Sequence, residues 1–279
     1  IDVATNAFTD GAGNNNIASS QFNWSYDNVA PTISISAKNS NGSVVNDGAV
    51  TNNDSLLITF TLSEAASNFT SSDISISGGQ LSSFTATSST VYTAIFKPSS
   101  AGETTIDVAT NAFTDGAGNN NIASSQFNWS YDNVAPTISI SAKNSNGSDV
   151  NDGAVTNNDS LLITFTLSEA ASNFTSNDVS LSGGQLSSFT ANSSTVYTAI
   201  FKPSSAGETT IDVATNVFTD GAGNDNIASS QFNWSYDNVA PTISSVNLLS
   251  DNSAIEILLS ETAFSQNNGS GLLEISDFQ

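Results

Sequence analysis

Residues 55–63 read SLLITFTLS, and apolar and polar side chains alternate along them. This alternation is the period-two pattern of a half-buried β-strand. One face carries the apolar members, Leu56, Ile58, Phe60 and Leu62. Thr and the β-branched residues also favour extended chain over helix. We therefore predict a strand here, with one face in a hydrophobic core and the other face in solvent.

Similar patterns recur on both sides of this stretch. Six further strands are expected at TISIS (32–36), SDISIS (72–77), QLSSFTA (80–86), VYTAIFKP (91–98), TTIDVAT (104–110) and QFNWSY (126–131). Segments rich in Gly, Asn, Asp and Pro separate them, and none of the segments has helical periodicity. Seven short strands in about 100 residues predict a β-sandwich, in which Trp129 and the other aromatic side chains pack in the core.

The whole pattern repeats every 105 residues, and residues 1–105 differ from residues 106–210 at only five positions. The recurring segment YDNVAPT contains a proline and lies between two predicted strands, as expected of an interdomain linker. A boundary near Asn28 divides the chain into four parts. Residues 1–28 are the last strands (F–G) of a truncated repeat, residues 29–133 and 134–238 are complete repeats, and residues 239–279 are the first strands (A–C) of a diverged, truncated repeat.

Composition narrows the classes of function. The chain has 26 acidic and four basic residues, a net charge of −22, no His and no Cys. Such a surface repels nucleic acid and anionic membranes, and no apolar run is long enough for membrane insertion. Without His, and with its acids on repeated turns, the chain is not expected to be an enzyme. Because disulfides are impossible, we expect a divalent cation to stabilise these small domains.

Four motifs taken together resemble a known family. They are TLSEAASNFT (61–70), VYTAIFKPSSAGETTIDVA (91–109), FTDGAGN (113–119) and YDNVAPT (131–137). The set resembles the bacterial Ig-like tandem repeats of giant calcium-dependent cell-surface adhesins. The resemblance spans every unit and implies an all-β fold, namely a tandem array of seven-stranded immunoglobulin-like β-sandwich domains forming an elongated rod. It also implies an extracellular, cell-surface location, an adhesive or spacer role, and calcium at the domain junctions.

One segment departs from that family pattern. The connection between the first two predicted strands, AKNSNGSVVNDGAVTNND (37–54), is unusually long and rich in Asn and Gly. An extra hairpin and a contact surface are the two interpretations of it.

Three acidic motifs are expected to meet at one end of each sandwich. In a seven-stranded Ig topology, the B–C and F–G loops lie at the end where the linker enters. These segments contribute Asp27 from the linker, Glu64 from the B–C loop, and Asp115 with Asn119 from the F–G loop. Their oxygen ligands suit calcium, whereas transition metals favour the missing His and Cys. The corresponding residues elsewhere are Asp132, Glu169, Asp220 and Asn224, then Asp237 and Glu261, and Asp10 with Asn14 in the first fragment.

A structural interpretation of these motifs stays open. DGAGN is also a good turn sequence, because Asp and Asn form side-chain turns and Gly adopts positive φ. Ser63–Glu64 is equally suited to ending a strand.

The sequence thus favours a structural or adhesive stalk of a large extracellular surface protein, stiffened by calcium. Its partners would be the neighbouring repeats of the same chain, and glycans or a host or cell surface would be bound through domains outside this stretch. A first alternative is the shaft of an extracellular filament or flagellar hair, assembled by lateral self-association of the repeats. A second alternative is direct binding of polysaccharide or ice.

Overall fold

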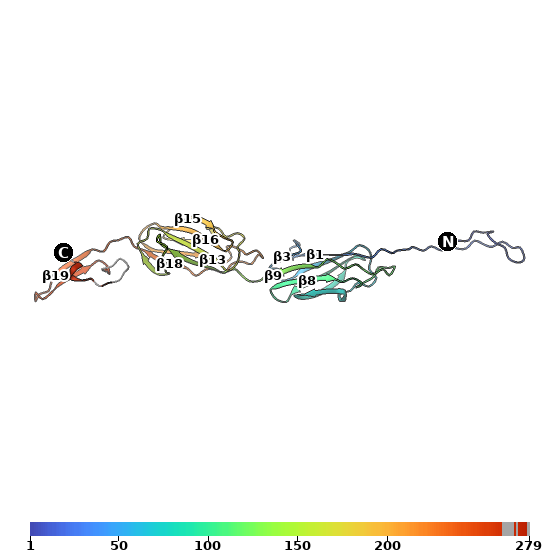
Figure 1. The fold of residues 1–279 in the computed structure, drawn as a ribbon, viewed down its shortest axis with the longest axis horizontal. Coiled ribbons are helices and arrows are strands. Elements are labelled where there is room, and N and C mark those ends of the chain that lie inside the picture. Colours follow the sequence, from blue (N-terminus) through green and yellow to red (C-terminus); the bar gives the residue numbers. More distant parts are fainter. Residues whose placement is uncertain (264–270, 272, 278–279) are drawn as a thin grey trace. The chain divides into compact units, whose positions relative to one another are not determined.

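The computed structural model describes residues 1–263, 271 and 273–277. The chain divides into two compact units, Ile1–Val134 with Gly221–Asn224, and Ala135–Asp220 with Asp225–Gln279. Each unit contains one complete β-sandwich, with strands β1 to β9 in the first and β10 to β18 in the second (Figure 1). Among the described residues, no helix has the length and apolar character needed to cross a membrane.

The first sandwich has a five-stranded and a four-stranded sheet, in the orders β2-β1-β4-β7-β6 and β3-β9-β8-β5. Neighbouring strands are antiparallel, except that β3 runs parallel to β9. A single 3-10 turn, η1 (Ser71–Asp73), precedes β5. The strands are β1 (Ile33–Lys38), β2 (Val44–Val45), β3 (Ala49–Thr51), β4 (Leu56–Leu62), β5 (Ile74–Ser77), β6 (Gly79–Ala86), β7 (Val91–Pro98), β8 (Gly102–Val108) and β9 (Phe127–Tyr131).

The second sandwich repeats this topology, with sheets β11-β10-β13-β16-β15 and β12-β18-β17-β14. Its elements are β10 (Ile138–Lys143), β11 (Asp149–Val150), β12 (Ala154–Thr156), β13 (Leu161–Leu167), η2 (Ser176–Asp178), β14 (Val179–Ser182), β15 (Gly184–Ala191), β16 (Val196–Pro203), β17 (Gly207–Val213) and β18 (Phe232–Tyr236). Beyond it, β19 (Ile243–Leu248) and β20 (Ile255–Leu259) form an antiparallel pair, and η3 (Ile275–Asp277) is a further 3-10 turn.

The predicted Ig-like sandwich is confirmed, and all seven predicted strands are present. Two short strands, β2 and β3, lie in the long connection between β1 and β4. Strand β2 forms a hairpin with β1, as one of the two interpretations of this segment required. Strand β3 then joins the opposite sheet beside β9, so this connection contributes to both sheets.

Alternating side chains of both sheets form the core of each sandwich. In β4 the predicted inward residues are buried, while Leu57 and Thr61 are exposed. Trp129 is 1% exposed and packs against the Phe96 ring in a T-shaped pair at 4.6 Å, which confirms its predicted place in the core. Phe69 contacts Tyr92 in the same way, with ring centroids 5.0 Å apart. Burial of one such side chain contributes about 1.5–3 kcal/mol.

Candidate metal centre

The linker that enters the first sandwich is fastened to the B–C loop directly after β4. The backbone N–H of Ser63 donates to the Thr32 carbonyl oxygen at 3.0 Å. In return, the Thr32 N–H donates to Ser63 Oγ at 2.9 Å. The serine of the Ser-Glu pair therefore positions its neighbour Glu64 beside the incoming chain.

The B–C and F–G loops are also joined to each other. Ala66 and Asp115 form an isolated antiparallel bridge. The Ser67 N–H donates to the Thr114 carbonyl at 2.9 Å, and the Thr114 N–H donates to Asn68 Oδ1 at 2.8 Å. These bonds place Glu64 and Asp115 at the same end of the sandwich, although 51 positions separate them in the sequence.

Asp115 is only 3% exposed and sits in a turn built around its own carboxylate. Its Oδ1 accepts the backbone N–H groups of Ala117 at 2.9 Å and Asn119 at 2.8 Å. Its Oδ2 accepts Asn119 Nδ2 at 2.7 Å. These hydrogen bonds, with that from the Asn119 side chain first, lower the pKa of Asp115. The carboxylate is therefore held in its charged form.

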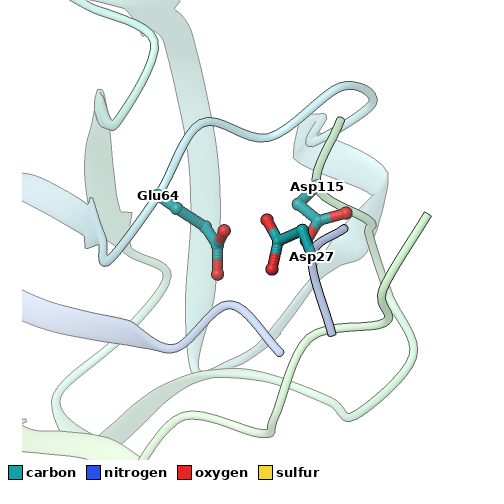
Figure 2. Close-up of side chains that lie close together, drawn as sticks. All are labelled: Asp27, Glu64 and Asp115. Atoms are coloured by element: carbon teal, nitrogen blue, oxygen red, sulfur yellow. The ribbon is translucent and has the colours of Figure 1, made fainter. Parts of the chain in front are cut away.

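The three predicted carboxylates lie together. Asp27, Glu64 and Asp115 each offer an oxygen, and these oxygens lie within 4.8 Å of one another. Figure 2 shows the Asp27 and Glu64 carboxylates facing each other, with Asp115 next to Asp27. Desolvation, followed by the charges of Asp27 and Asp115, raises the pKa of Glu64. The arrangement concentrates negative charge and oxygen ligands at one point, which is the chemistry of a hard divalent cation.

Asn119 lies beside this cluster as a donor. Its Nδ2 donates to the Asp27 carbonyl oxygen at 3.3 Å as well as to Asp115. The side chain that was expected as a ligand therefore links the linker backbone to the F–G loop.

The other predicted site residues occupy matching places in their own segments. In the second unit, Glu169 follows β13, and Asp220 is 3% exposed and bridges to Ala171. Asp132, in the first unit, follows β9, and its N–H donates to the Thr51 carbonyl at 3.0 Å. Asn224 holds the position in its loop that Asn119 holds in the first copy.

The two incomplete copies show parts of the same pattern. Asp10 is exposed and accepts Asn14 Nδ2 at 2.9 Å, so its turn matches that of Asp115. This hydrogen bond is the main cause of a lowered pKa at Asp10. In the second unit, Asp237 and Glu261 line one cleft together with Asn158.

One structural residue of this region was missed by the sequence analysis. Asn121 is 1% exposed, its Oδ1 accepts the N–H groups of Ala112 and Phe113, and its Nδ2 donates to the Ala109 carbonyl. These bonds hold the F–G loop against the core. The sequence did contain a signal for this role. The asparagine recurs as Asn226 in the last copy, although the residue before it changes there from Asn to Asp225.

Sequence comparison identifies the family. The profile described as "Bacterial Ig-like domain" matches residues 27–131 and again residues 132–236, which together are most of the chain. The chain belongs to the bacterial Ig-like domain family.

Three of the solved structures that are similar to this bacterial Ig-like chain are of bacterial proteins. InvD of Yersinia pseudotuberculosis has 16% identity and a TM-score of 0.34, over 78% of this chain and 62% of that one. Invasin, described as a bacterial integrin-binding protein, has 12% identity and a TM-score of 0.41, over 82% and 47%. The C-terminal domain of the Streptococcus agalactiae AgI/II polypeptide BspA has 14% identity and a TM-score of 0.34, over 73% and 99%.

The bacterial Ig-like chain thus spans about three fifths of InvD and about half of invasin. A comparison with curated proteins found no match. Family membership establishes the type of domain. The acidic cluster of Asp27, Glu64 and Asp115 is observed in the structure of this chain itself.

Proposed function

We propose that this chain is a non-catalytic stalk segment of an extracellular bacterial surface protein, in which calcium at Asp27, Glu64 and Asp115 fixes each linker to the sandwich that follows it. Tandem domains of a bacterial Ig-like family support the stalk role. The convergence of three carboxylates from the linker, the B–C loop and the F–G loop supports the ion. The partners at a host or cell surface would then belong to other parts of the protein.

Calcium is the cation that these residues suit best. It accepts six to eight oxygen ligands in flexible geometry, and carboxylates, backbone carbonyls and water supply them. Asp115 is already oriented and charged, so part of the site is formed before any ion binds. Asp27 brings the linker into the same cluster. A bound calcium ion would neutralise the repulsion among the three carboxylates and would therefore hold the linker in one position.

The proposal extends by sequence equivalence to the other copies. The residues concerned are Asp132, Glu169, Asp220 and Asn224, then Asp237 with Glu261, and Asp10 with Asn14. Extracellular modules bind calcium with Kd on the order of 10⁻⁴–10⁻³ M, so millimolar calcium would fill such sites.

The test is thermal unfolding of the whole chain in calcium and in chelator. At about 100-fold excess over Kd, one bound ion adds about 2.7 kcal/mol, and Tm should rise by several degrees. An unchanged Tm in wild type would refute the calcium role and leave the stalk assignment standing.

The variant Glu64→Gln should change Tm in opposite directions in calcium and in chelator. In calcium it should lower Tm, because a ligand charge is lost. In chelator it should raise Tm, because repulsion from Asp27 and Asp115 is lost with it. Asp54→Asn is the matched control, since Asp54 is an exposed loop residue, and it should behave alike in both conditions. A purely structural role for Glu64 would give the same sign in both.

A further inference from the structure

The four lysines of the chain all project from one sheet of each sandwich. In the first sandwich, Lys38 on β1 and Lys97 on β7 are exposed and alternate with buried residues. Lys143 and Lys202 are their counterparts in the second. Strands β1, β2, β4, β6 and β7 contain no Asp or Glu. In these described strands, the outer face of the five-stranded sheet therefore carries positive charge only.

Apolar side chains lie between these lysines. Lys38 pairs in register with Leu57, and Leu57 pairs with Ile95. Leu57 is 40% exposed, and Val44, which pairs with Lys38 from the edge strand, is 64% exposed. Lys97 lies two residues beyond Ile95 on the same face. The face thus has a short apolar row of Val44, Leu57 and Ile95, with Lys38 between the first two and Lys97 next to the last.

The outer face of the other sheet has the opposite charge. Glu103 and Asp107 lie on β8 and alternate with the buried Thr104, Ile106 and Val108. Strands β3, β5, β8 and β9 contain no lysine. The two acids are four residues apart on one strand, about 13 Å. Two strand spacings and two residues separate Lys38 from Lys97, about 12 Å.

We infer that the five-stranded face of one molecule binds the four-stranded face of a second copy of this chain. The complementary charges, at matching spacing, are both on this chain, which identifies the partner. The contact joins two different faces, so each molecule keeps one free face of each kind and association continues beyond a dimer. The lysine pair runs obliquely across its sheet and the acidic pair runs along one strand, so the strands of the docked sheets cross.

This association is independent of the calcium centre and goes beyond the stalk function. Exposed ion pairs are individually weak, so one sandwich alone would bind its partner loosely. The chain carries both charged pairs a second time. The lysine pair recurs as Lys143 and Lys202, and the acidic pair recurs as Glu208 and Asp212. When both sandwiches engage together, the apparent affinity exceeds that of either one.

Within the strands of this face, the two repeats differ at one position. Where the first has Val44, the second has Asp149, whose Oδ1 lies 3.0 Å from Lys143 Nζ. That internal ion pair neutralises part of the second face. Val44→Asp, which places a carboxylate opposite Lys38, should therefore weaken association about two- to five-fold, and Asp149→Val should strengthen it similarly.

The test is sedimentation velocity of the full chain at low salt, in chelator so that divalent ions play no part. The sedimentation coefficient of wild type should rise with concentration, and this rise should vanish in 1 M NaCl, where the Debye length is about 3 Å. Two charge-reversed variants should each stay monomeric alone. One changes the four lysines to Glu, and the other changes Glu103, Asp107, Glu208 and Asp212 to Lys.

A mixture of the two reversed variants should associate again, because each then meets complementary faces on the other. Both variants remain net negative, so overall charge attraction cannot produce this rescue. Ser89→Glu with Ser194→Glu, on exposed turns, is the control and should associate like wild type. A monomeric wild type at every concentration, or reversed variants that associate alone as wild type does, would overturn the inference.

Discussion

At the scale of single residues, the carboxylate of Glu64 makes the metal-free sandwich sensitive to pH. Its pKa is raised, by desolvation first and then by Asp27 and Asp115, so the folded chain binds this proton more readily than the unfolded chain. The resulting stability is fully present below the ordinary pKa of 4.5 and is lost as pH rises through the folded value. In chelator, Tm should therefore respond to pH in this window more steeply for Asp54→Asn than for Glu64→Gln. If Tm changed equally with pH in both variants, the Glu64 carboxylate would not be the source of the pH dependence.

Asn121 should matter more to stability than its neighbour Asn119. Asn121→Ala leaves the N–H groups of Ala112 and Phe113 without their acceptor inside the protein. Each unsatisfied buried group costs about 1–3 kcal/mol, so we expect a loss of about 3 kcal/mol in urea unfolding. Asn119→Ala, at a half-buried position, should cost less than half as much. A larger loss for Asn119 would show that the linker, and not the buried asparagine, holds the loop.

At the scale of strands, two adjacent glycines allow β6 to begin close to its neighbours. A Cβ on Gly79 would lie 2.4 Å from Phe96 Cε1 and 2.5 Å from the Lys97 carbonyl oxygen. Both partners belong to β7, and the Phe96 ring is fully buried, so neither can move aside easily. Gly79→Ala should cost about 1–3 kcal/mol or more through overpacking. Gly116→Ala, with no atom within 4 Å, is the control and should unfold at a urea concentration close to that of wild type.

The seven longer strands were predictable because alternation along one strand is a local property of the sequence. Leu56, Ile58 and Phe60 show their face without knowledge of any partner. Strands β2 and β3 have only two and three residues, too few for alternation to appear. Their pairing depends on the free edges of β1 and β9, which are made elsewhere in the chain. The unusual length of this segment was therefore visible in the sequence, but its membership of both sheets was not.

At the scale of the whole molecule, the acidic cluster was predictable from the strand topology and from the repetition of its motifs. The alternation of strand direction was enough to bring Asp27, Glu64 and Asp115 to one end. The individual roles within the cluster were not predictable, because they depend on which atoms face each other. The burial of Asp115 and the donor role of Asn119 follow from the turn geometry.

The parallel pair of β3 and β9 has a consequence for a chain under tension. Tension from the N-terminal side enters at β1, which pairs with β4, and it reaches the start of β3 once β1 and β2 have separated. The start of β3 and the end of β9 are then pulled in opposite directions, so the parallel pair is sheared and its hydrogen bonds carry the load together. The Asp47 carboxylate accepts the Asn128 N–H at 2.7 Å and so adds a hydrogen bond next to the three paired positions of β3 and β9. In single-molecule stretching, Asp47→Ala should lower the rupture force of one sandwich and leave the second unchanged, and Asp54→Ala should leave both unchanged. The short strand that the sequence did not reveal would then resist the unfolding of each sandwich under tension after β1 has separated.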